Sequence, residues 1–169
     1  GSDDIDIYAQ RVDSSGSVKW TADGVVICAA SGLQIYPRMV SDGWGGAIIA
    51  WQDGRNSGWD IYAQRVSSNS TVRWTANGVA ICTVSGDQSA TQLVSDGVGG
   101  AIIAWEDSRS GTNSDVYAQR VGAWDAIQWN PGDPGGIAVC NVSGDQVSPQ
   151  LASDGMGGAI VTWGDYRSG

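Results

Sequence analysis

The chain repeats itself at an interval of 54 to 55 residues, and this repetition limits the folds that it can adopt. The segment Asp-Ile-Tyr-Ala-Gln-Arg-Val occupies residues 6–12 and returns at residues 60–66, and it appears again at residues 115–121 with one Ile replaced by Val. Residues 6–59 and 60–113 align without gaps, with 32 identities in 54 positions. Such a period indicates a repeat architecture, in which each unit is one supersecondary motif and neighbouring units share a core.

Each repeat divides into four short apolar runs. When the second repeat is taken from its natural start after residue 89, the runs are residues 90–95, 100–106 and 115–121, and a stretch around residues 127–129 that could continue to Cys140. Breaks rich in Gly, Asp and Ser separate them, which is typical of antiparallel strands joined by hairpins. The run at residues 101–105 is apolar on both faces, and this predicts a strand that lies between neighbouring sheets.

The composition also favours strands over helices. The chain has 25 Gly and 17 Asp, but one Lys, one Glu and three Leu. Helices favour Leu, Glu and Lys because straight side chains keep their rotamer freedom there. We therefore expect an all-β chain.

Further segments recur in register with the first. They are the Ser-Asp-Gly triplets at 41–43, 95–97 and 153–155, and the Gly-Gly-Ala-Ile segments that end in Trp51, Trp105 and Trp163. With these motifs, residues 3–169 resemble the long-blade β-propeller repeats of secreted bacterial repeat proteins. The resemblance implies a β-propeller and an extracellular or cell-surface location in a bacterium. A β-solenoid is the main alternative, but its coils are usually shorter. Residues 1–2 look like a cloning scar.

A propeller blade is a four-stranded sheet whose strands, A to D, run from the ring axis outward. In the first complete blade we expect A at residues 37–42, B at 46–52, C at 60–66, and D in the stretch that holds Trp74 and Cys82. The chain begins at a strand C and ends after a strand B. The repeats therefore supply twelve strands, or three blades' worth with one blade split into halves; they span residues 6–59, 60–114 and 115–169.

The two half blades are complementary, and this predicts a partner. Propellers have four to eight blades, and exposed sheet edges recruit further strands. Two copies could close a six-bladed ring by exchanging strands, so we expect a homodimer. Three alternatives stay open: a sterically tight three-bladed ring within one chain, a piece of a longer natural array, and an engineered or truncated fragment.

The residue inventory argues against several functions. The absence of His excludes a Ser-His-Asp triad and a His-containing zinc site. The net charge of −9 disfavours a nucleic-acid partner, and the longest apolar run, residues 25–30, is too short for a membrane span. Three near-copies of the same groups also lack the asymmetric acid–base pair that most enzymes need. We expect no cofactor and no catalytic residues.

An Asp-x-Arg motif follows each predicted strand B and is the first candidate ligand-binding feature. Arg can bind carboxylates and sugar hydroxyls because its planar fork donates hydrogen bonds in pairs. The alternative is structural, in which Asp caps the turn and Arg pairs with it or with the neighbouring blade. The candidate ligand-binding residues are Asp53, Arg55, Asp107, Arg109 and Arg167, together with Trp59 in the same loop as Arg55.

Two further tryptophans, Trp44 and Trp124, do not recur between repeats. Both lie in connections that a propeller places on one face, whereas Trp59 belongs to the opposite face. Exposed tryptophans often anchor sugars or protein partners, so Trp44 and Trp124 are candidate partner contacts. The alternative is local loop packing.

Three other recurring sets have structural explanations. Arg11, Arg65 and Arg120 lie in strand C, where we expect them to pair between blades with recurring Asp residues. The Asp residues of the Ser-Asp-Gly triplets, Asp42, Asp96 and Asp154, should build the A–B turn, with calcium binding as the alternative. The three Cys are expected to be small buried side chains and not a disulfide set.

These observations predict a non-catalytic repeat module that acts as a binding or assembly scaffold. A lectin with one sugar site per blade is the alternative, based on architecture only. The ligand could be a glycan or a protein.

Overall fold

The structure is a computed structural model that describes residues 4–124, 127–133 and 135–167. These residues form twelve β-strands in four antiparallel sheets and no helix. The first sheet pairs β1 (Ile7–Ala9) with β2 (Val25–Cys28). The second has the order β3 (Gln34–Ser41), β4 (Ala47–Asp53), β5 (Asp60–Val66), β6 (Val79–Cys82). The third has the order β7 (Gln88–Ser95), β8 (Ala101–Asp107), β9 (Asp115–Val121), β10 (Ile137–Cys140). The fourth pairs β11 (Gln146–Ser153) with β12 (Ala159–Asp165).

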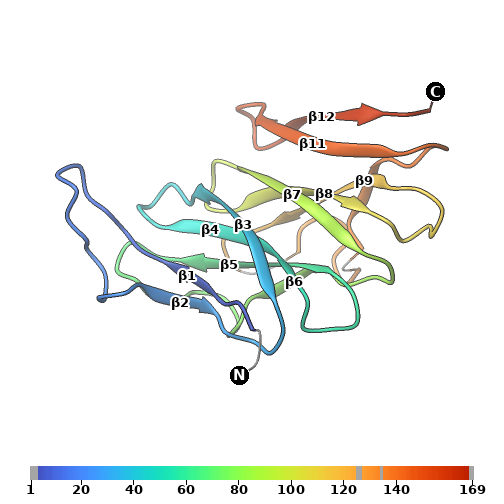
Figure 1. The fold of residues 1–169 in the computed structure, drawn as a ribbon. Coiled ribbons are helices and arrows are strands. Elements are labelled where there is room, and N and C mark those ends of the chain that lie inside the picture. Colours follow the sequence, from blue (N-terminus) through green and yellow to red (C-terminus); the bar gives the residue numbers. More distant parts are fainter. Residues whose placement is uncertain (1–3, 125–126, 134, 168–169) are drawn as a thin grey trace.

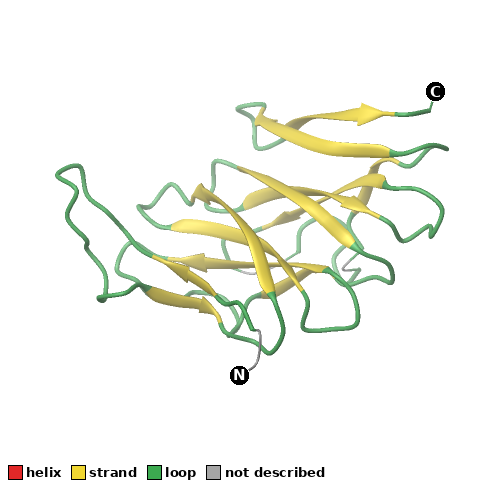
Figure 2. Cartoon of the chain, viewed as in Figure 1, coloured by secondary structure: helices red, strands yellow, loops and turns green. Residues whose placement is uncertain are grey.

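The all-β class and the division into two half sheets and two full sheets agree with the expectation from the repeats (Figure 2). Several predicted boundaries were wrong. The first strand of the second sheet begins at Gln34 and not at residue 37, because Gln34 already pairs with Asp53 across a bulge. The last strand of that sheet, β6, contains Cys82 but not Trp74, which lies in the loop before it.

Strand β1 is also shorter than the predicted residues 6–12. The equivalent strand β5 is held along seven residues by β4, from Asp60 to Val66. In the described chain β1 pairs only with β2, and Ile5 and Val12 beside it form only isolated bridges, to Leu33 and Val18. Since residues 6–12 and 60–66 have the same sequence, β1 is shorter than β5 because no strand equivalent to β4 lies beside it in the described chain.

The four sheets follow one another without closing into a ring. Strands β3 and β11 each pack against β7, so the first strands of the successive sheets lie side by side. The sheet β1–β2 and the sheet β11–β12 lie at opposite ends of the molecule (Figure 1). The single-chain, three-bladed ring is therefore absent from this structure.

Hydrophobic clusters fill the spaces between the first three sheets. One cluster joins the second and third sheets around Trp105, and the other joins the first and second sheets around Trp51. Strands β4 and β8 are buried along almost their whole length, as predicted for a strand between sheets. Strand β12 has the same apolar pattern but is largely exposed.

Candidate functional site

At the ends of β4 and β8, the Asp-x-Arg motif forms a turn that is closed by hydrogen bonds between its Asp and its Arg. Asp53 Oδ1 accepts hydrogen bonds from the backbone N and from Nε of Arg55, at 3.0 and 2.8 Å, and Asp53 Oδ2 accepts one from Arg55 Nη2 at 2.6 Å. Asp107 and Arg109 repeat this arrangement at 2.9, 2.8 and 2.6 Å. Each Asp caps its turn and pairs with its Arg, which is the structural explanation given above.

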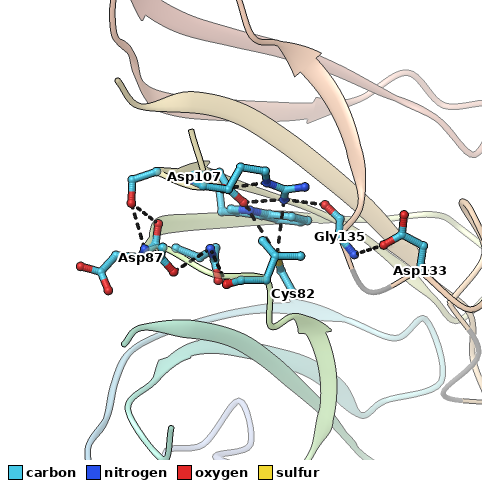
Figure 3. Close-up of polar contacts among 11 residues, drawn as sticks. Cys82, Asp87, Asp107, Asp133 and Gly135 are labelled. Carbon is cyan, nitrogen blue, oxygen red and sulfur yellow. Dashed lines mark hydrogen bonds and ion pairs between the residues drawn. The ribbon is translucent and has the colours of Figure 1, made fainter. Parts of the chain in front are cut away.

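The same carboxylate and guanidinium also tie together neighbouring strands. In the third sheet, Trp105 Nε1 donates to Asp107 Oδ2 at 2.7 Å, and Arg109 Nη2 donates to the carbonyl of Gly135 at 2.6 Å. The Arg109 guanidinium lies 3.7 Å from the centroid of the Tyr117 ring. Figure 3 shows Asp107, Gly135 and Cys82 gathered around this network.

The network has an electrostatic cause as well as a geometric one. Burial opposes the ionisation of Asp107, but hydrogen bonds from Arg109 and Trp105 outweigh it and lower the pKa of the carboxyl below its ordinary value. The buried charge is thus fully paired. Arg55 and Arg109 therefore use most of their donors inside the protein, and the geometry of these turns offers little to a ligand.

The third copy of the network is incomplete. Trp163 Nε1 donates to Asp165 Oδ2 at 2.9 Å, and Arg167 pairs with Asp165. The side chain of Arg167 is 49% exposed, against 18% for Arg55. Within the described residues, Arg167 has neither a tyrosine ring nor a loop carbonyl of the kind that the other two arginines use.

The arginines in the third strand of each full sheet, Arg65 in β5 and Arg120 in β9, also differ from the copy near the start of the chain, Arg11. Arg65 pairs with Asp42 at 2.9 Å and Arg120 pairs with Asp96 at 2.9 Å, and both carboxylates are buried. The predicted pairing between blades was wrong, because each pair joins two strands of one sheet. For Arg11 and Asp154, no ion pair is found in the part of the chain that the structure describes.

The predicted role of the Ser-Asp-Gly triplets is confirmed. Asp42 Oδ1 accepts the backbone N–H groups of Trp44 and Gly46, both at 2.8 Å, and so closes the turn between β3 and β4. Asp154 closes the β11–β12 turn in the same way, with bonds from Met156 and Gly158 at 2.7 and 2.9 Å. Among the described residues, no group of three or more His, Cys, Asp or Glu could hold a metal ion.

The tryptophans that do not recur between repeats lie on the opposite faces that the sequence predicted for them. Trp44 and Trp124 line one pocket of about 530 Å³ at the junction of the second and third sheets. Trp59 lies in a separate pocket of about 320 Å³, beside Gly54 and Asp87. Arg55 lines neither of these two pockets.

Sequence reasoning missed that the cysteines take part in the turn network. Arg55 Nη2 lies 3.3 Å from Cys28 Sγ, and Arg109 Nη2 lies 3.5 Å from Cys82 Sγ. The shared period of the Cys and Arg positions was the only signal. All three cysteines are free thiols; Cys28 and Cys82 are fully buried, and Cys140 is partly exposed.

Thiol labelling should reveal this burial. In a variant that keeps only Cys82, with Cys28→Ala and Cys140→Ala, we expect labelling at about pH 8 to be at least about a hundredfold slower than in denaturant. Burial raises the pKa of the Cys82 thiol to about 12, so little thiolate is present, and the sulfur is also inaccessible. A rate within about tenfold of the denatured rate would contradict the packing described here.

Comparisons with known proteins add no family assignment: no family model, no curated protein and no solved structure matches the chain. No helix of the described residues is long and apolar enough to cross a membrane.

Proposed function

We propose that the chain is a non-catalytic β-propeller repeat module that acts as a binding or assembly scaffold, and that two copies close a six-bladed ring by strand exchange. In this arrangement β11 and β12 of one copy join β1 and β2 of the other in a hybrid four-stranded blade. The ring contains two such blades and four complete ones.

The exposure of β12 is the observation that carries this proposal. Its Ile160 is 62% exposed, whereas the equivalent Ile48 and Ile102 are fully buried. In the described chain β12 pairs only with β11, so one edge of an apolar strand is unfilled. Such edges recruit another strand. Strand β1 fits this edge because residues 6–12 have the sequence of residues 60–66, which contain β5, the strand that pairs with β4.

The repeat also predicts the register of the exchanged strands. In the second sheet Trp51 pairs with Tyr62 and Ala50 pairs with Ala63. The equivalent pairs in the hybrid blade are Trp163 with Tyr8, and Thr162 with Ala9, from different copies. This register repeats, between the two copies, the contacts that Arg55, Trp51 and Asp42 make within one chain. Arg167 meets the ring of Tyr8 and the carbonyl of Asp23; Trp163 meets Gly24; Asp154 meets Arg11.

Cysteine cross-linking can test both the partner and the register. Ala9→Cys and Thr162→Cys are combined in a chain whose natural cysteines are replaced by Ala. Directly opposed residues on antiparallel strands have Cα atoms within disulfide range. We expect a covalent dimer on a non-reducing gel, and also from a mixture of the two single variants.

The matched control is Tyr8→Cys with Thr162→Cys, which shifts the pair by one residue and points the side chains to opposite faces. It should cross-link poorly. A cross-link confined to the monomer band, or none at all, would contradict strand exchange between copies. If neighbouring repeats of a longer array fill these edges instead, this chain alone would run as a monomer on the gel.

A lectin function at the Asp-x-Arg turns has weaker support. A sugar site needs hydrogen-bonding groups that are not already satisfied, and Arg55 and Arg109 are held by Asp, Tyr and backbone carbonyls. The scaffold role is therefore the function that the geometry supports best. If the chain binds a sugar, another surface must provide the site.

A further inference from the structure

A pocket lies at the junction between the two full sheets, on the side of the Ser-Asp-Gly turns. The pocket between the second and third sheets measures about 530 Å³. Its lining includes residues from the β3–β4 turn, from β5 and the loop after it, and from the loop after β9: Asp42, Trp44, Arg65, Asn69, Arg73 and Trp124. All of them belong to one chain, so the pocket does not depend on ring closure.

Two indole rings flank a guanidinium in this pocket. The Arg65 guanidinium carbon lies 4.6 Å from the centroid of the Trp44 ring and 6.0 Å from that of the Trp124 ring. The two tryptophans are 55% and 71% exposed, although large aromatic side chains are normally buried. The Trp44 ring also lies directly against Gly99, where a Cβ would be 2.3 Å from it. The absence of a side chain at Gly99 thus leaves room for the Trp44 ring beside the third sheet.

The pocket has a charge opposite to that of the chain. Arg65 and Arg73 face a single carboxylate, Asp42, among the described lining residues, whereas the whole chain has a net charge of −9. Arg65 is committed to Asp42 and to the carbonyl of Ala123. Arg73 is exposed, and within the described residues it forms no ion pair. Asn69 accepts a bond from Ser67 at its Oδ1, and its amide N–H groups have no hydrogen-bond partner among the described residues.

The next junction shows that these features are local. Its pocket, of about 410 Å³, contains the equivalent pair Asp96 and Arg120, but Val98 and Met156 are the residues equivalent to Trp44. The shared scaffold thus carries indole rings at one junction and aliphatic side chains at the other. Because the fold does not require the rings, their presence at the first junction calls for another explanation.

We propose that the pocket between Trp44 and Trp124 binds a pyranose that carries a carboxylate, such as a uronic acid residue. The apolar face of the sugar ring packs on an indole, as sugars commonly do on exposed tryptophan. The carboxylate accepts paired hydrogen bonds from Arg73, whose fork matches its geometry. The Asn69 amide donates to a ring hydroxyl.

The test follows the tryptophan indole N–H signals by nitrogen–proton NMR during titration with methyl glucuronide. We expect shifts of the Trp44 and Trp124 signals, and affinity at least about tenfold higher than for methyl glucoside, which lacks the carboxylate. An oligosaccharide with internal glucuronate distinguishes a terminal from an internal sugar as the natural ligand. Equal affinity for the neutral sugar, or no shift at these two indoles, would overturn the proposal.

Variants separate binding from folding. Trp44→Val introduces the residue found at the equivalent position 98, so it should fold, and Arg73→Gln keeps most of the side-chain stem. Each should weaken glucuronide binding about tenfold or more. Arg38→Gln, at an exposed arginine of β3, changes the charge equally and should bind as the unmodified protein does. Because the oligomeric mass is measured in the same samples, loss of binding and loss of the ring are distinguished.

Discussion

Reversing the charge of Arg11 should convert the proposed dimer into monomers. In the proposed ring, each Arg11 pairs with Asp154 of the other copy, as Arg65 pairs with Asp42 inside the second sheet. The side chains of that internal pair are 5% and 1% exposed, so the hybrid pair should also be buried. Removing one partner of a buried ion pair costs about 3–5 kcal/mol, and the ring contains two such pairs. Arg11→Asp should therefore weaken association by about a thousandfold or more.

The restoring variant makes this prediction specific. Asp154→Arg alone should give the same monomer, whereas Arg11→Asp combined with Asp154→Arg reverses both partners and should recover the dimer. Arg38→Asp, at an exposed arginine without an ion pair among the described residues, should leave the mass unchanged. Light scattering over a concentration series measures all four variants. A dimer that survives Arg11→Asp would refute the hybrid blade.

Gly78→Val will unfold the chain or destabilise it severely. Gly78 has a φ of +91°, and a Cβ there would lie 2.6 Å from Cη2 of Trp51 and 2.9 Å from the carbonyl oxygen of Ala63. Both atoms belong to buried residues that cannot move away. Backbone strain and overpacking together should lower the free energy of unfolding by roughly 3–5 kcal/mol. Urea denaturation followed by fluorescence measures the loss.

Two other glycines provide controls. Gly43 has a similar φ of +79°, but nothing lies within 4 Å of its Cβ position, so Gly43→Val should cost only about 1–2 kcal/mol of backbone strain. Gly24 is equivalent to Gly78, yet no Trp is among its nearest atoms. In the proposed ring, Trp163 of the other copy takes that place. Gly24→Val should therefore reduce dimerisation more than it reduces the stability of the single chain; equal losses would argue against the contact.

The sequence was sufficient to predict the class of the fold and the number of strands. Repetition supplied both, because a period near 54 residues with four apolar runs leaves room for one four-stranded sheet per repeat. Strand ends were less predictable. Gln34 is polar and gives no strand signal, but it is buried and pairs with Asp53 because the neighbouring strand extends that far.

The site was predicted less well, because a residue type does not reveal which of its hydrogen bonds are already satisfied. Arg55 and Arg73 look alike in the sequence, but only Arg55 is enclosed by a carboxylate, a tyrosine ring and a carbonyl. The departures from the repeat were more informative than the repeated residues. Trp44 and Trp124 were identified because they do not recur, and the structure brings them to one pocket.

The most direct test of the central claim, that this chain forms half of a closed ring, is its mass in solution. Multi-angle light scattering at micromolar concentration should give twice the chain mass of 17.5 kDa, with the half blades completed by exchange. A mass of 17.5 kDa under the same conditions would contradict the account. The exposed edge of β12 would then have to be filled by something other than a second copy of this chain.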